Sequence, residues 1–218
     1  MFTKYNLKNI KLIEQCVKFI EEVLDEREWS HGIEHSKQVA INSLEIWFSG
    51  ENEKYNEISN KTFLEVEPIT VVIFSALLHD VMDHKYVKYM PINIGATLED
   101  LIGITGKNSA KIINQIIKNI SYSSEITNGL CQLPEDVQCL RNIVSDADKL
   151  EALGEIGIQR TIAYQHETSS NETDEQIIEM AKKYINEKLS FIYPDFLHTE
   201  YGLKVGKERT VVMKRMNE

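Results

Sequence analysis

The chain has 218 residues, 42% hydrophobic and 27% charged, which is ordinary globular composition and enough length to bury a sizeable core. Acidic residues outnumber basic ones by 34 to 24, giving a net charge of −10, which argues against a protein that neutralises a nucleic-acid backbone. Residues 1–13 lack the apolar core of a signal peptide, and no run approaches the roughly 18 apolar residues of a membrane span. The three cysteines show no CxxC spacing, which fits a protein of the reducing cytoplasm.

Helical periodicity dominates the chain in order from its start. Apolar residues recur at three- and four-residue steps from Leu7 to Leu24, and similar spacing returns in the later segments. Pro68 suits the first turn of a helix, where its missing N–H costs nothing, and Pro134 begins another with acidic residues after it. Helices are predicted near residues 7–24, 30–48, 68–80, 94–102, 107–120, 134–148, 174–189 and 197–216.

The segments between these helices are polar or rich in turn residues. We expect a surface loop at 51–67, turns at 121–132, an interruption at Gly154 and Gly157, and a polar connection at 169–174. Period-two alternation is nearly absent, which argues against strands. The sequence therefore predicts an all-α protein with one globular domain over residues 1–218 and no internal repeat.

One apolar helix ends in two side chains that carry chemistry. The run 71–78 contains only apolar or small residues and is followed by His79 and Asp80. A buried carboxylate needs a cation, a metal or a strong hydrogen-bonding network. Upstream, His31 and His35 are four residues apart and would share one face of a helix. A helical histidine by itself is more often a satisfied or exposed side chain than a ligand.

A later helix carries three acids within six residues, at Asp146, Asp148 and Glu151. A solvated helix end is the alternative interpretation of such a cluster. Asp146 and Asp148 point to nearly opposite faces, so one of them is expected to serve a given metal. Asp148 shares a face with Val144 and Glu151, which places it toward the core, whereas Asp146 is expected to bond a neighbouring helix or groups behind the ligands.

Two imidazoles and two carboxylates suit a divalent transition metal such as manganese, iron, nickel or zinc. Three segments with these residues resemble the HD-domain metal-dependent phosphohydrolases, and among them a bacterial single-domain subgroup. The segments are His31-Gly32-Ile33-Glu34-His35, the run LLHDVMDHK, and residues 146–160 with the sequence DADKLEALGEIGIQR. The HD dipeptide by itself is weak evidence, but three segments in the family's H…HD…D order are far more specific.

The resemblance covers about residues 20–170, with the helices of 174–216 expected to pack on that core. It implies an all-α fold of the HD-domain type, with one divalent metal between core helices, held by His35, His79, Asp80 and Asp148. Manganese is our preferred ion among Mn, Fe, Ni, Zn and Mg. The chain has Lys149 where the subgroup commonly has Arg and Glu151 where Asp is common, so bidentate phosphate binding at position 149 would weaken.

The implied activity is hydrolysis of a small phosphorylated metabolite, preferably a nucleotide, with pyrophosphate release from nucleoside triphosphates as the favoured variant. Asp83 is a candidate general base, or else an acid that bonds backbone N–H groups at a helix end. His31, Lys85 and Arg160 are candidate phosphate-binding residues, with solvated surface positions as the alternative. His166 and His198 lie in polar sequence and are predicted to be surface residues.

No histidine lies between Lys85 and Gln165, which favours a single metal, with His84 as the spare nitrogen ligand nearby. Two other function classes stay open. One is a non-catalytic, metal-containing module that binds a nucleotide or signals. The other is an all-α dimerisation protein with fortuitous acids. The resemblance also allows a homodimer.

Overall fold

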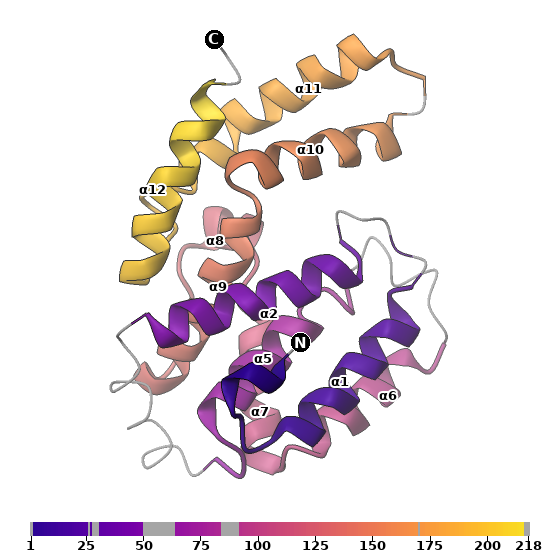
Figure 1. The fold of residues 1–218 in the computed structure, drawn as a ribbon, viewed down its shortest axis with the longest axis vertical. Coiled ribbons are helices and arrows are strands. Elements are labelled where there is room, and N and C mark those ends of the chain that lie inside the picture. The colour runs from indigo at the N-terminus through magenta and orange to yellow at the C-terminus, as the bar shows by residue number, and fades with distance from the viewer. Residues whose placement is uncertain are drawn as a thin grey trace.

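The computed structural model describes residues 2–25, 27, 31–49, 64–83, 92–169 and 171–215, and within these ranges every regular element is helical (Figure 1). The predicted all-α class is therefore confirmed. The elements are η1 (Phe2–Tyr5), α1 (Ile10–Val23), α2 (Ile33–Phe48), α5 (Pro68–Leu78), α6 (Ile94–Gly103), α7 (Lys107–Lys118), α8 (Tyr122–Asn128), α9 (Glu135–Glu151), α10 (Gly154–Thr168), α11 (Asp174–Glu187), η3 (Leu189–Phe191) and α12 (Glu200–Lys214).

Helix α5 is the centre of the core. Every residue from Pro68 to Leu78 is buried, because α1, α2, α7 and α9 all pack against this one helix. A helix covered on all sides has no polar face, which explains why its sequence consists of apolar residues interrupted only by the small hydroxyl residues Thr70 and Ser75. Pro68 occupies its first turn, as expected.

Helices α2 and α9 pack against α5 and against each other, so three helices meet in one region of the core. The buried side chains of α2 include Val39, Leu44 and Trp47, the inward face that the periodicity predicts. The described part of the chain contains no helix long and apolar enough to span a membrane.

The C-terminal helices form a second group. Helix α10 packs against both α11 and α12, and the three lie together in the orange-to-yellow part of Figure 1. Thr173 begins α11 with a capping box that includes Gln176. Thr199 begins α12 by accepting a hydrogen bond from the backbone N–H of Gly202.

The structure differs from the sequence prediction at two connections. Residues 121–132, predicted as turns, contain the short helix α8, which Ser121 caps by accepting from the backbone N–H of Ser124. Gly157, predicted to interrupt a helix, lies inside α10, which begins at Gly154. A Cβ atom on Gly157 would collide with the carbonyl of Ala152, so the glycine allows α10 to turn tightly away from the end of α9.

The predicted surface loop at 51–67 falls largely outside the described residues, as do His84 and Lys85. The single-domain organisation stays a prediction.

Candidate metal centre and cavity

Four of the side chains singled out in the sequence meet where α2, α5 and α9 come together. His35 is in the first turn of α2, His79 and Asp80 follow the last residue of α5, and Asp148 is near the end of α9. The Nε2 atom of His35 lies 3.3 Å from Asp148 Oδ1 and 3.7 Å from Asp80 Oδ2. The Nε2 atom of His79 lies 3.3 Å from Asp80 Oδ2 and 3.7 Å from Asp148 Oδ1. Each histidine therefore faces both carboxylates.

The hydrogen bond on the other side of His79 fixes its tautomer. Its Nδ1 lies 2.8 Å from the carbonyl oxygen of Ala76, and a carbonyl can only accept, so Nδ1 carries the proton. Its buried Nε2 has no hydrogen-bond partner among the described residues and, in the neutral ring, turns a lone pair toward two carboxylates. That arrangement requires a cation between them, either a proton on Nε2 or a metal ion.

The spacing of these atoms fits a metal ion. Two ligands about 2.1 Å from one ion lie roughly 3.0 Å apart at a right angle and roughly 3.4 Å apart at a tetrahedral angle. The four nitrogen–oxygen separations of 3.3–3.7 Å are close to that range. His35, His79 and Asp80 form a cluster able to hold a metal, and Asp148 faces both histidines.

The four groups perturb one another strongly. Burial would lower the pKa of His79, but the negative charge of the adjacent Asp80 outweighs burial and raises that pKa to about 9. Burial and the nearby Arg160 charge lower the pKa of His35 to about 4. Burial opposes ionisation of Asp80 and Asp148, yet the histidines keep the pKa of both carboxyls low. Both acids are therefore ionised at neutral pH and leave negative charge for a cation to balance.

The structure places His31 and Arg160 beside this cluster. The ring of His31 contacts that of His35 edge-on, with centroids 6.3 Å apart, and also contacts the ring of Tyr164 at 5.9 Å. Arg160 is close enough for its charge to lower the pKa of His35. The backbone N–H of Asp83 donates to the Asp80 carbonyl oxygen at 3.0 Å, in the turn that follows α5. The predicted roles of His31, Arg160, Asp83 and Lys85 stay predictions.

A cavity of about 390 Å³ opens beside the cluster. Its walls come from α8, α9, α10 and α11 together with the residues flanking α2 and η3, and it combines three tyrosines with several cationic or hydroxyl groups. The lining residues are His31, Tyr122, Ser123, Asp148, Lys149, Ala152, Gly157, Arg160, Thr161, Tyr164, Tyr184, Lys188, Leu189 and Ile192. Asp83 is not among them.

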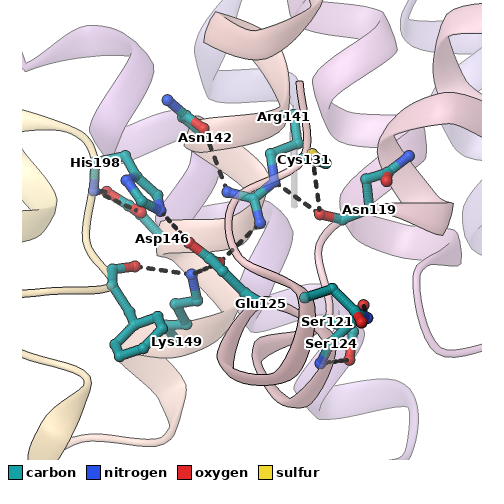
Figure 2. A network of polar contacts seen from close by, with 12 residues as sticks. Asn119, Ser121, Ser124, Glu125, Cys131, Arg141, Asn142, Asp146, Lys149 and His198 are labelled. Carbon is teal, nitrogen blue, oxygen red and sulfur yellow. Dashed lines mark hydrogen bonds and ion pairs between the residues drawn. The ribbon is translucent and has the colours of Figure 1, made fainter. Parts of the chain in front are cut away.

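Lys149 lines the cavity, but its charge is used inside the protein (Figure 2). Its Nζ donates to Glu125 Oε2 at 2.6 Å and to the carbonyl oxygen of Phe196 at 2.8 Å. Glu125 also accepts from Arg141 Nη2 at 2.9 Å, and the Nε2 of His198 lies 2.7 Å from its other oxygen. Lys149 therefore anchors α9 to α8 and to the segment before α12.

His198 was predicted to be a surface residue, and that prediction is wrong. Its side chain is 16% exposed and bonds the buried Glu125. The polar sequence around it gave no sign that α8 would be packed against it. His166 is exposed, as predicted.

Asp146 behaves as expected for a residue on the opposite face from Asp148, because its carboxylate accepts from the backbone N–H groups of His198 and Thr199, at distances of 2.7–3.0 Å.

Arg27 escaped the sequence analysis because it belongs to no motif. Its Nη1 donates to the carbonyl oxygen of Asp80 at 2.6 Å and its Nη2 to that of Val81 at 2.7 Å. These carbonyls follow the end of α5, where helical hydrogen bonds run out, so the guanidinium holds the backbone of Asp80 in place.

No family model matches the sequence. The uncharacterized protein YpgQ of Bacillus subtilis is 25% identical over 159 residues, which span 72% of this chain and 68% of that protein. The crystal structure of YpgQ in complex with ADP resembles this structure with a TM-score of 0.65 at 21% identity, covering 93% of this chain and 92% of that one. The crystal structure of an HD-superfamily hydrolase from Bacillus thuringiensis resembles this structure with a TM-score of 0.60 at 23% identity, covering 94% of this chain and 92% of that one. The chain therefore has the fold predicted from its HD-type motifs.

Proposed function

We propose that this protein is a metal-dependent phosphohydrolase that acts on a small phosphorylated metabolite, preferably a nucleotide. The observation that carries the proposal is the pair of histidine Nε2 atoms facing two ionised carboxylates at one side of a cavity that also contains His31 and Arg160. The HD-superfamily hydrolase and the ADP complex of YpgQ support it as proteins of the same fold. Release of pyrophosphate from nucleoside triphosphates is the favoured variant.

His35, His79, Asp80 and Asp148 would hold one divalent ion, with manganese as the preferred choice. Such an ion polarises a phosphoryl oxygen and lowers the pKa of water toward about 7. The chain's own residues supply the rest. Arg160 and His31 would bind the phosphate oxygens from the cavity wall, and the Ala76 carbonyl holds His79 in the tautomer that presents Nε2. Asp83 would act as the general base, Lys85 would supply a further cation, and the protein would form a homodimer.

The size of the cavity favours a single nucleotide or a smaller metabolite. Sites for small molecules run from about 300 to 1,000 Å³, and about 390 Å³ lies near the lower end. The tyrosine rings of the lining offer flat apolar surfaces of the kind on which a base stacks.

The test is a panel of nucleotides and other phosphate esters, assayed with added Mn²⁺, Fe²⁺, Ni²⁺, Zn²⁺ or Mg²⁺. We expect metal-dependent turnover by the wild type and a fall in kcat/KM of more than about 100-fold in Asp80→Ala and His79→Ala, with loss of bound metal. His166→Ala is the matched control, because it removes an exposed histidine that does not line the cavity. Nucleotide binding without turnover on any substrate would instead favour the non-catalytic binding module.

A further inference from the structure

The cavity has a second polar wall that the proposed metal site does not use. It consists of Tyr122 and Ser123 on α8 with Tyr184 and Lys188 at the C-terminal end of α11, and we call it the Lys188 wall. These helices are different from the three that carry the metal cluster. A substrate held at the cluster by its phosphate would reach this wall with the opposite part of the molecule.

Several contacts fix Lys188 in the wall. Its Nζ donates to Ser123 Oγ at 3.1 Å and lies over the ring of Tyr184, 5.3 Å from the centroid. Its carbonyl oxygen accepts from the hydroxyl of Tyr122 at 2.8 Å. Burial raises the pKa of Tyr122 to about 12, so that hydroxyl keeps its proton and remains a donor. Lys188 is half-buried, and these contacts connect it to Ser123 and Tyr122 of α8 and to Tyr184 of α11.

The charge of Lys188 is not neutralised as that of Lys149 is. Lys149 is paired with Glu125, whereas no carboxylate of the described residues lies within 4.0 Å of Lys188 Nζ. In a protein with a net charge of −10, a cation without an acidic partner in a cavity wall is an attractive position for an electron-rich group of a ligand.

The hydrogen-bonding pattern of this wall is made of donors. The ammonium has three N–H groups, and one is used by Ser123, which leaves two. Ser123 accepts from Lys188 and so has its own O–H to donate. Such a pair matches an oxygen acceptor and mismatches an exocyclic amine, which would present its own donors.

We propose, on the basis of the function proposed above, that Lys188 and Ser123 bind an oxygen acceptor on the part of the substrate remote from the reacting phosphate. The substrate class is therefore a nucleotide with such an acceptor, and a base with a carbonyl oxygen, such as a 6-oxopurine or uracil, is the leading source. A second phosphate on the ribose offers the same chemistry. The adenine base has no carbonyl oxygen, so adenine nucleotides without that phosphate should depend little on Lys188.

The experiment compares wild type, Lys188→Met, Lys188→Arg and Ser123→Ala with GTP, UTP, ATP and 3′-phosphorylated ATP in the presence of Mn²⁺. Lys183→Met is the matched control, because Lys183 is an exposed lysine of α11, near Lys188 in the sequence, that does not line the cavity. Both KM and kcat are measured, together with binding of each nucleotide by calorimetric titration. Circular dichroism and urea unfolding confirm that the variants are folded.

We expect Lys188→Met to raise KM and the dissociation constant for GTP and UTP by about 10-fold, the effect of losing one hydrogen bond from a charged group, with kcat nearly unchanged. ATP should change by less than about twofold, and Lys188→Arg should recover part of the loss. A selective loss for 3′-phosphorylated ATP would assign the acceptor to a phosphate. Equal effects on all four nucleotides, or none, would overturn the inference.

The calorimetric arm separates this inference from the proposed function. If the wild type hydrolyses no phosphate but binds GTP and UTP through Lys188, the function fails and the inference stands. If turnover is metal-dependent and Lys188→Met binds every nucleotide as the wild type does, the inference fails and the function stands.

Discussion

Replacing Glu125 by Gln tests the buried ion cluster that joins α8, α9 and the start of α12. The Glu125 side chain is 4% exposed, and its Oε2 accepts from both Arg141 and Lys149, whose side chains are 1% exposed. Gln keeps the shape but removes the charge and replaces one oxygen by an NH₂ group. Lys149 or Arg141 would then face the NH₂ group of the glutamine, and both would lose the negative charge that balances them (Figure 2).

The expected cost is about 3 kcal/mol, at the lower end of the roughly 3–5 kcal/mol for removing one partner of a buried ion pair. The lower end applies because both cations keep another acceptor. Arg141 still donates to the carbonyl oxygen of Asn119 at 2.8 Å, and Lys149 to that of Phe196 at 2.8 Å. Adding Lys149→Met to Glu125→Gln should recover part of the loss, since it removes one of the buried charges left behind.

The assay is urea unfolding at pH 7, with Glu179→Gln as the control. Glu179 is an exposed acid of α11, and its replacement should change the free energy of unfolding by less than about 0.5 kcal/mol. A loss below about 1 kcal/mol in Glu125→Gln would refute the reasoning, as would a double variant less stable than the single one.

The pH dependence gives a second readout. Burial opposes ionisation of Glu125, but hydrogen bonds from His198, Lys149 and Arg141 hold its pKa well below the ordinary value of 4.5. A carboxyl with a lowered pKa in the folded protein stabilises it above the ordinary pKa, and that contribution is lost as the pH falls below it. The difference in unfolding free energy between the wild type and Glu125→Gln should therefore narrow below about pH 4.5.

Three further changes test other contacts. Gly202→Ala should lower the free energy of unfolding by about 1–3 kcal/mol, because the added Cβ atom would collide with Asp146 Oδ2. Thermal unfolding measures the loss, and an unchanged melting temperature would contradict the prediction. Arg27→Ala should weaken Mn²⁺ binding by about 10-fold, because it frees the backbone of Asp80, with calorimetric titration as the measurement and Arg27→Lys retaining part of the affinity. Backbone N–H groups at the start of α7 lower the pKa of Glu65 to about 2. The wild type should therefore have a larger free energy of unfolding than Glu65→Gln above about pH 4.5, and this difference should disappear as the pH falls toward 2. A difference in unfolding free energy that stays constant with pH would argue against the contact.

Local sequence predicted those parts of the fold in which periodicity and caps agree with burial. The apolar run of α5 predicts a helix covered on every side, and Pro68 places its start. Helix α8 was missed because it has seven residues, too few for a periodic signal, and depends on the single cap at Ser121.

The candidate site likewise contains residues that the sequence identified and residues that it did not. The motifs selected His35, His79, Asp80 and Asp148, and the structure brings all four together at the junction of three helices. Residues without a motif could not be found, because their roles arise from contacts between segments far apart in the chain. Arg27 reaches the end of α5 across more than 50 residues, and its sequence surroundings predict no such contact.

The sequence by itself determined the all-α class and the set of candidate ligands, because helical spacing and motif order are properties of neighbouring residues. Only the tertiary structure decided which charges are used within the protein and which face the cavity. Lys149, next to a candidate ligand, is buried against Glu125, while Lys188, which belongs to no motif, lies in the cavity wall. That difference comes from how α8, α9 and α11 pack, and spacing along one helix carries no information about which partner another helix will bring.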